Sequence, residues 1–422
     1  MKILIAPWGD PKGWDEILYS FKGRDKNSRT SLKILVDTIQ PDKLFIIGLD
    51  TLIEEKVFSY VEVVEKAKNK LSTYCKDFEI KSSEIIIAPG VGEFSHNIFK
   101  GNALDYYYYI TAKLIEKFLE HYDEEFEVHL DLTHGINFMP VLTYRSVKEI
   151  LEILSIFTKV NFIVYNADPY IKNITKSLSI NIIEEGKIFS RAFNSGTHDH
   201  KILTPRDLIE EERRKLYEDE LKILRNINMK EISAFLGSIY NGLPLALFSF
   251  FPDLKILNNI IPIILDIYRR YIKIEVREKL EVKRRLEFNE KFKILLFVYL
   301  ISNLLEKNNI ISERKLEVKL KEIKELNSKL FKFDKRSYVR IDKEVYNLEK
   351  DIKDKNIDQW KLYNEILERN IGEIDQRNFL AHAGFEGNSI EVKKEDKELL
   401  LRYKQEQKET IKNLCMEGLS MI

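Results

Sequence analysis

The sequence predicts an α/β N-terminal part with a mostly parallel sheet, followed by an all-α C-terminal region. Two observations predict this division. Short apolar runs alternate with amphipathic stretches over the first 200 residues, which also hold ten of the 16 glycines and six of the 10 prolines. The last proline is Pro262, and the chain beyond it is rich in Lys, Glu, Leu and Ile, with no residue that must end a helix by lacking an N–H.

Five apolar runs of the N-terminal part have the length of strands and are bounded by Gly, Pro, Asp or Asn. They cover residues 2–6, 43–48, 83–88, 127–131 and 160–165. Helix-period stretches lie between them at 31–39, 52–74, 103–121 and 138–154. This alternation predicts a parallel sheet covered on both faces, which is a Rossmann-like arrangement. The runs 178–184 and 187–193 are expected to add antiparallel edge strands.

The rest of the chain is assigned to two further parts. An Arg- and Glu-rich stretch from Thr204 through Lys230 predicts the start of a helical connector. We therefore divide the chain into residues 1–195, a connector at 196–286 that could include a helix-turn-helix, and a C-terminal domain at 287–422. The segments 273–283 and 315–324 are interpreted as charged helix surface, with nucleic-acid contact as the less favoured alternative.

Composition excludes several classes of protein. The 422 residues carry 68 basic and 68 acidic side chains, so no net charge draws the whole chain to nucleic acid or membrane. No Gly-x-Gly-x-x-Gly follows the first strand and no Gly-x4-Gly-Lys-Ser/Thr occurs, which disfavours a dinucleotide cofactor and a triphosphatase. Cys75 and Cys415 lack ligand partners at metal-binding spacing, so we expect no metal. The apolar runs are too short to span a bilayer, and we expect a cytoplasmic protein.

Polar residues follow the predicted strands where a parallel sheet binds its ligands, outside the carboxyl ends. The candidates are Trp8, Gly9, Asp10, Ser28, Thr30, Ser31, Gly90, Gly92, Glu93, Phe94, Asp131, Thr133, His134, Gly135 and Asn137. Singly, Ser28 or Thr30 is more often a helix cap, Trp8 a core aromatic and Asp131 a turn former. Together these residues form one polar rim. Its small residues and neutral donors suit adenine bases and ribose hydroxyls.

A second candidate centre lies far downstream, at Arg377, Asn378 and His382. Arg377 and His382 are five positions apart, so on a regular helix the two side chains would point about 140° apart. Either the helix ends near Ala381, with Gly384 as its cap, or the pair is structural. A histidine at a helix end can also simply be a favourable charge at the negative end of the dipole.

The rim segments resemble a known sensor domain. The string from Asp131 to Pro140 (DLTHGINFMP), with residues 7–9, 28–31 and 101–105, is similar to the CARF domain of the CARF–HEPN ribonucleases that accompany type III CRISPR systems, the Csx1/Csm6-like family, Csx1 type. The resemblance covers about 190 residues. It implies a sensor of cyclic oligoadenylate, with cyclic tetra-adenylate as the expected activator, held across the axis of a homodimer.

The downstream centre matches the Arg-x4-6-His motif of HEPN ribonucleases, with the polar Asn378 directly after the arginine. The resemblance implies metal-independent cleavage of single-stranded RNA by attack of the 2′-OH, leaving 2′,3′-cyclic phosphate and 5′-OH ends, without a cofactor. His382 suits proton transfer, Arg377 suits phosphate oxygens and Asn378 would position these groups. The resemblance also implies that two Arg–His pairs converge across a dimer, which could assemble further.

Two alternatives remain open at this point. A ligand-responsive transcription regulator would bind DNA through the connector, but such a protein has no need for Arg377 and His382. The sensor domain could also cleave its own ligand with Thr133 and His134, although the sequence offers no distinct base there.

Overall fold

A computed structural model describes residues 1–421 except 82, 189–194, 198–200, 333 and 397. The chain forms two compact units. The first comprises Met1–Ser190, Leu203–Tyr217 and Ile263–Asn289, and the second comprises Arg191–Ile202, Glu218–Pro262 and Glu290–Ile422. Among the helices of the described residues, none combines the length and apolar character needed to cross a membrane.

The first unit is built on an eight-stranded sheet with the order β3-β2-β10-β9-β8-β1-β4-β5. Its strands are β1 (Lys2–Pro7), β2 (Ile17–Phe21), β3 (Arg24–Ser28), β4 (Lys43–Leu49), β5 (Ser83–Ala88), β8 (Glu125–Asp131), β9 (Lys159–Ala167) and β10 (Ser177–Lys187). The strands β5, β4, β1, β8 and β9 run parallel, as predicted, and β10 pairs antiparallel with β9. The further strand predicted at 187–193 falls mostly outside the described residues.

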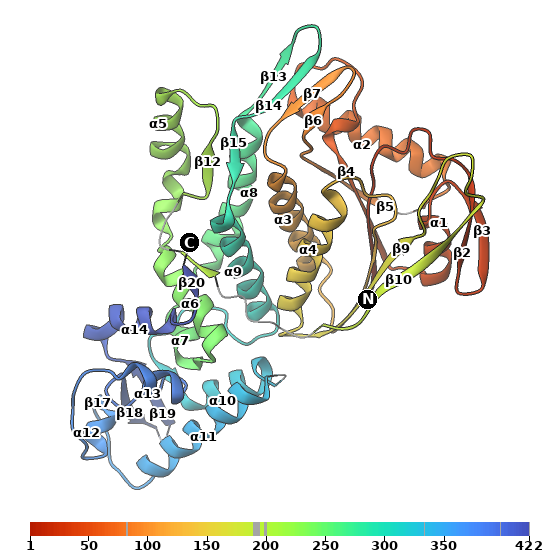
Figure 1. Cartoon of the computed structure of the whole chain (residues 1–422). Helices are drawn as coiled ribbons and strands as arrows, with labels where there is room; N and C mark the ends of the chain where they lie inside the picture. Colours follow the sequence, from red (N-terminus) through yellow and green to blue (C-terminus); the bar gives the residue numbers. More distant parts are fainter. Residues whose placement is uncertain (82, 189–194, 198–200, 333, 397, 422) are drawn as a thin grey trace. The chain divides into compact units, whose positions relative to one another are not determined.

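Helices cover both faces of this sheet (Figure 1). The connections are α1 (Leu32–Ile39), α2 (Tyr60–Asp77), α3 (Leu104–Glu120) and α4 (Met139–Leu154), with a 3-10 turn η1 at Asp50–Leu52. The crossovers through α1 and α2 move toward β5, and those through α3 and α4 move back past β1 toward β9. Right-handed crossovers in opposite directions place their helices on opposite faces. The central parallel strands β1 and β4 are almost continuously apolar because both of their faces are buried.

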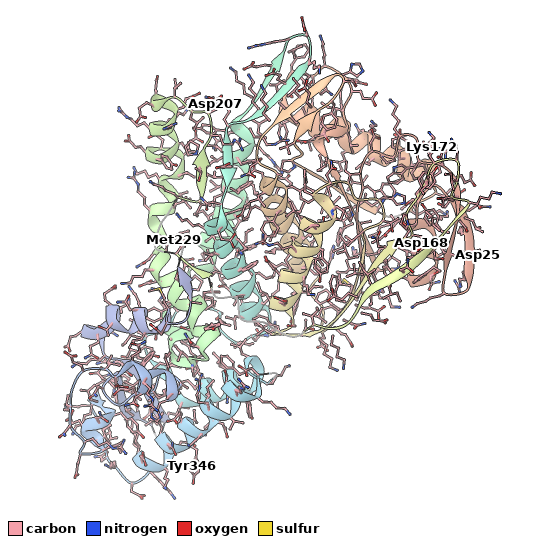
Figure 2. The ribbon with its side chains drawn as sticks, viewed as in Figure 1. Asp25, Asp168, Lys172, Asp207, Met229 and Tyr346 are labelled. Atoms are coloured by element: carbon pink, nitrogen blue, oxygen red, sulfur yellow. The ribbon has the colours of Figure 1, made fainter. Side chains whose placement is uncertain are left out.

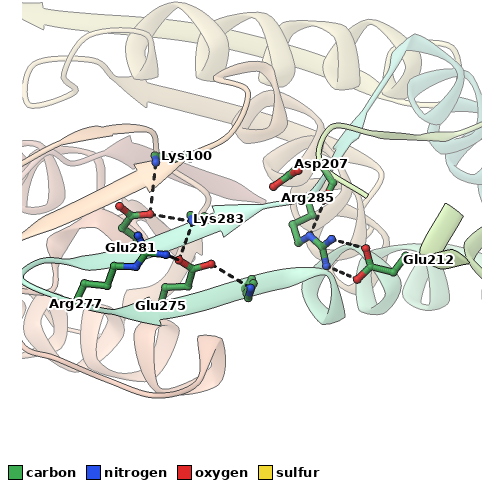
Figure 3. Close-up of polar contacts among 9 residues, drawn as sticks. Lys100, Asp207, Glu212, Glu275, Arg277, Glu281, Lys283 and Arg285 are labelled. Atoms are coloured by element: carbon green, nitrogen blue, oxygen red, sulfur yellow. Dashed lines mark hydrogen bonds and ion pairs between the residues drawn. The ribbon is translucent and has the colours of Figure 1, made fainter. Parts of the chain in front are cut away.

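The hairpin β13 (Ile272–Val276) and β14 (Leu280–Arg284) corrects the expectation that 273–283 is helix surface and that the connector is helical throughout. Its residues alternate between apolar and charged, which is the period of a strand. β14 pairs parallel with β7 (Asn97–Lys100), which β6 (Gly92–Glu93) extends. Figure 3 shows the charged face of this hairpin, where Lys283 lies 2.8 Å from Glu275 and 3.1 Å from Glu281.

The remaining elements of the first unit are short. They are β12 (Leu203–Pro205), β15 (Leu286–Phe288) and α5 (Glu210–Glu218), and α8 (Leu254–Arg270) ends in this unit. β12 pairs antiparallel with β15. Arg285, which follows β14, donates to the Asp207 carbonyl at 2.7 Å and to Glu212 at 2.6 Å (Figure 3).

The second unit is mainly helical, as predicted. Its helices are η2 (Glu220–Asn226), α6 (Met229–Asn241), α7 (Pro244–Ser249), α9 (Glu290–Lys307), α10 (Leu320–Leu330), α11 (Lys335–Ile352), α12 (Tyr363–Ile366), α13 (Gln376–Ala381), η3 (Gln405–Gln407) and α14 (Lys408–Cys415). α6 and α14 approach closely at Gly237, where an added Cβ would lie 2.0 Å from the Cys415 carbonyl oxygen. A two-stranded pair joins β11 (Ser195–Gly196) to β20 (Ser420–Met421).

A four-stranded antiparallel sheet in the second unit corrects the all-helical expectation for this part of the chain. It contains β16 (Val318–Lys319), β17 (Lys361–Leu362), β18 (Ile390–Glu395) and β19 (Glu398–Tyr403). Ile390 and Val392 are buried while the residue between them is partly exposed, which is the two-residue period of a half-buried strand. Charged residues on the other face hide this period in a composition rich in Lys and Glu.

Candidate ligand rim and candidate catalytic centre

The rim forms at β1 and β8, where the crossover connections change the direction in which they move across the sheet. β1 pairs with β4 on one side and with β8 on the other, so the carboxyl ends of β1 and β8 meet at a topological switch point. The Gly9 N–H donates to the His134 carbonyl at 2.8 Å and joins the two loops directly. Both loops need glycine, because an added Cβ on Gly9 would lie 2.6 Å from Ile136 and one on Gly135 would lie 2.8 Å from Pro140.

Asp131 anchors the loop that follows β8. This residue is 1% exposed, and its carboxylate accepts from the Ser31 hydroxyl at 2.7 Å and from the Thr133 hydroxyl and N–H at 2.6 and 3.1 Å. Burial raises the pKa of Asp131, and these donors oppose the rise. The Thr133 hydroxyl accepts in turn from the Ala167 N–H at 3.1 Å. One carboxylate therefore ties together the ends of β8 and β9 and the start of α1.

His134 presents a neutral imidazole at the rim. Burial lowers the pKa of its ring to about 3. Nε2 accepts from the Ser31 N–H at 3.2 Å and lies 3.3 Å from the Tyr19 hydroxyl, so the proton of the neutral ring is on Nδ1. The Trp14 ring is stacked on the imidazole with 4.0 Å between centroids. The result is a fixed aromatic surface whose polar edge is already engaged with backbone.

A cavity of about 460 Å³ opens beside His134, which is within the range of small-molecule sites. Residues that the sequence predicted for the site and that line it are Thr133, His134 and Gly135. Arg29, from the segment 28–31 that carries the resemblance, also lines it. Residues that sequence reasoning missed come from the β2 region, from the end of β9 and from the β9–β10 turn, among them Trp14, Tyr19, Asn166, Asp168 and Tyr170. Asp168 is labelled in Figure 2. The alternation of buried and partly exposed residues in β2 is the sequence pattern that could have predicted this strand.

Other predicted rim residues support the loops. Trp8 is fully buried and its backbone N–H donates to the Ile47 carbonyl at 2.8 Å. The buried hydroxyls of Ser28 and Thr30 accept N–H groups of the turn that leads into α1, but neither residue caps the helix, whose N-cap is Ser31 without a side-chain cap bond. Asn137 is exposed and has a positive φ of 51° just before α4.

The remaining candidates do not join this cavity. Asp10 pairs with Lys70 at 3.1 Å, and the Gly90 N–H donates to the Asp50 carboxylate at 2.8 Å. Gly92 and Glu93 form β6, and Phe94 follows it, next to β7. For the candidates that follow β5 the reason is topological, because β5 lies three strands from β8, or about 14 Å at the usual strand spacing.

The candidate catalytic residues lie on and just after the short helix α13. The Asp375 carboxylate caps this helix by accepting from the Asn378 N–H at 2.7 Å. The helix ends at Ala381, and Ala383 and Gly384 follow with positive φ of 53° and 83°. The Gly384 N–H donates to the Phe379 carbonyl at 2.8 Å. His382 therefore leaves the regular helix, which is the first of the two possibilities that its spacing from Arg377 allowed.

Glu344 of α11 holds the His382 imidazole. Nδ1 of His382 lies 3.1 Å from Oε1 of Glu344, and the Glu344 side chain is 12% exposed while that of His382 is 48% exposed. This contact engages Nδ1 of the ring. Arg377 and Asn378 are exposed on the same short helix. Sequence reasoning missed Glu344 because it belongs to another helix and to no local motif.

Two further side chains fix the position of this centre. Arg340 of α11 donates to the Leu380 carbonyl of α13 at 3.0 Å and to the Gly242 carbonyl at 3.3 Å. Asn388 accepts from the Gly372 N–H at 3.1 Å and donates to the Glu373 carbonyl at 3.2 Å, which holds the loop that enters α13. Within the described residues, no group of three or more His, Cys, Asp or Glu side chains could hold a metal ion.

Comparisons with known proteins agree with both halves of this description. Residues 3–169 match the family model of the CARF domain of the CRISPR system endoribonuclease Csx1, and residues 334–406 match that of its HEPN domain. The chain is also 35% identical over 416 residues to the CRISPR system endoribonuclease Csx1 of Methanocaldococcus jannaschii, covering 93% of this chain and 86% of the relative. The chain therefore belongs to the Csx1 family of CRISPR-associated endoribonucleases, as the resemblance of its motifs implied.

Proposed function

We propose that this endoribonuclease is activated by a cyclic oligoadenylate, with cyclic tetra-adenylate as the expected ring, and cleaves single-stranded RNA without a metal ion. The observation that carries the proposal is the presence of two separate sites in one chain. A cavity beside neutral His134 lies at the switch point of the sheet, and a histidine in contact with a carboxylate follows five positions after Arg377 in the chain. Family membership favours this enzyme over the transcription regulator.

The cavity has the chemistry for an adenine nucleotide. Trp14 and His134 line the cavity with aromatic side chains, and stacking of a base on an aromatic side chain contributes about 1–3 kcal/mol. Asn166 and Asp168 bring amide and carboxylate groups that can recognise amino and hydroxyl groups. A ring of identical nucleotides suits a two-fold axis, so we infer that two copies of this rim share one ligand in a homodimer.

The catalytic centre has the groups that metal-independent cleavage requires. The ribose 2′-OH loses its proton and its oxygen attacks the adjacent phosphorus, while the bond from phosphorus to the 5′ oxygen breaks and that oxygen gains a proton. The products are a 2′,3′-cyclic phosphate and a 5′-OH. His382 would transfer a proton through Nε2, while Glu344 fixes the orientation of the ring through Nδ1. Arg377 would bind phosphate oxygens as charge builds up on them, and Asn378 would orient the phosphate.

One assay tests ligand dependence and metal independence together. Purified protein is incubated with labelled RNA in EDTA, with and without cyclic oligoadenylates of different ring size. Cleavage that requires one of the rings and persists in EDTA is expected, and His382→Ala should abolish it without loss of ligand binding. Cleavage that is indifferent to every ring would contradict the activation, and a His382→Ala protein that still cuts would contradict the catalytic assignment.

A further inference from the structure

A lysine-rich groove lies in the second unit, outside the catalytic residues. It has a volume of about 580 Å³ and is bounded by the start of α10, the end of α11 and the β18–β19 strands. Five lysines and two glutamates line it, so its net charge is +3. The lysines are Lys319, Lys321, Lys324, Lys353 and Lys394, and the glutamates are Glu349 and Glu398.

The two glutamates do not balance the lysines. Glu398 is shared by Lys319 and Lys321, and Glu349 pairs with Lys324 at 2.6 Å. The Lys394 ammonium donates to the carbonyl oxygens of Lys353 and Lys355 at 2.9 and 2.6 Å. Backbone carbonyls therefore hold this cation at the groove, where it adds a charge that neither glutamate offsets.

The positions of the lysines favour an anion as well. Lys319 is the N-cap of α10 and Lys321 lies in its first turn. Cations at this end of a helix oppose the helix dipole, whereas an anion there is stabilised by it. The Glu322 carboxylate of the same turn already accepts from the Lys319 N–H at 3.0 Å, so the attraction for a phosphate comes mainly from the net charge of the groove.

The geometry points to a track for the phosphate backbone of the RNA substrate in this groove, outside the cleavage centre. Lys353 lies nine residues after Glu344, about 14 Å further along the axis if the rise of α11 is continued to it. A few nucleotides of single-stranded RNA span such a distance. The inference rests on the endoribonuclease activity of the family and does not depend on the roles assigned to His382 or to the cyclic ligand.

Charge substitutions in the groove test the track, since some should weaken RNA binding and others should tighten it. Lys321→Glu with Lys353→Glu changes the charge of the groove by four units and should weaken binding of a 2′-O-methyl RNA of about 20 nucleotides at least tenfold. The dependence of log K on log salt should become shallower by about 0.7 for each phosphate that the variant no longer binds. Glu349→Gln should tighten binding of the same RNA. The matched control is Lys222→Glu with Lys255→Glu, two exposed lysines of the same unit outside the groove, and it should change binding less than twofold.

Cleavage separates the track from the catalytic centre. The groove variant should raise KM for an RNA of about 20 nucleotides, leave kcat near that of the wild type, and leave cleavage of an RNA of about four nucleotides unchanged. Loss of kcat on both substrates would place the lysines in folding or catalysis and would overturn the inference. Unchanged RNA affinity in both the lysine variant and Glu349→Gln would overturn it too, and would leave the groove to a protein partner.

Discussion

Substitution of Glu344 by glutamine tests the geometry of the proposed catalytic centre most directly. The change keeps the shape of the side chain and one hydrogen-bond acceptor but removes the charge that faces Nδ1 of His382 at 3.1 Å. We expect kcat for RNA cleavage to fall while KM and ligand affinity stay near the wild-type values. The reason is that Glu344 contacts the histidine and not the proposed substrate.

The magnitude follows from the environment of the pair. Two charges about 4 Å apart interact by about 4 kcal/mol at the effective dielectric of a protein surface. His382 is 48% exposed, so solvent screens much of this, and the loss should be nearer 1.4–2.7 kcal/mol of transition-state stabilisation, about 10- to 100-fold in kcat.

The assay is single-turnover cleavage of labelled RNA at saturating activator. Glu344→Asp, which keeps the charge on a shorter side chain, should recover part of the loss. Asp342→Asn, an exposed carboxylate on the same helix, should leave the rate unchanged. If Glu344→Gln cleaves within twofold of the wild type, the carboxylate does not position His382 and the proposed role is wrong.

Four other predictions concern the rim, the core and the dimer. Trp14→Ala should weaken binding of cyclic oligoadenylate about 10- to 100-fold in a direct titration, because one stacking surface is lost, and unchanged affinity would place the ligand elsewhere. Since burial lowers the pKa of His134 to about 3, only the unfolded chain gains a proton there as pH falls below about 6.5, so stability decreases toward acid. In urea titrations, His134→Gln should reduce the loss of unfolding free energy between pH 6.5 and 5 by about 2 kcal/mol. If the free energy of unfolding of the variant falls with pH as steeply as that of the wild type, the lowered pKa of His134 is refuted. Arg284→Met should lower the free energy of unfolding of the first unit by about 3 kcal/mol, because the fully buried Asp50 carboxylate then loses its cationic partner and keeps its bonds from the Gly90 N–H and the Tyr60 hydroxyl. A decrease of less than about 1 kcal/mol would contradict this. An excess of His382→Ala chains, allowed to exchange with wild type, should depress activity more steeply than the wild-type fraction falls if each site needs two chains, whereas strict proportionality would mean that each chain holds a complete centre.

The parallel strands of the first unit could be predicted because both of their faces are buried. Continuous apolar runs such as those of β1 and β4, set between helix-period segments, are typical of strands in a covered parallel sheet. The hairpins could not be predicted as well, because each has a charged face. β3 reads RDKNS, and β13 reads IKIEV within a lysine-rich stretch. Alternation over five residues is a weak signal when the polar positions are also typical of a helix surface.

Because the sequence did not predict the β2–β3 hairpin, it also missed the site residues on that hairpin. Tyr19 lies on β2 and Trp14 just before it, so missing that strand also hid one side of the cavity wall. The composition of the loop after β5 predicts a place in the rim, but strand order decides which loops meet. Strand order depends on long-range pairing, which a single sequence does not encode locally. The same reason hid Glu344, since only the packing of α11 brings it to His382.

The proposed switch can be assessed by its energy. A ligand shifts an equilibrium only by its difference in affinity for the two states, so 100-fold activation requires about 2.7 kcal/mol of differential binding. Stacking of one base contributes about 1–3 kcal/mol, and the imidazole of His134 is fixed through Ser31 and Trp14. Complete stacking in only one of the two states would thus supply most of the required energy. On this reasoning Trp14→Ala should lower the maximal activation as well as the affinity, whereas a residue that binds both states equally should change affinity alone.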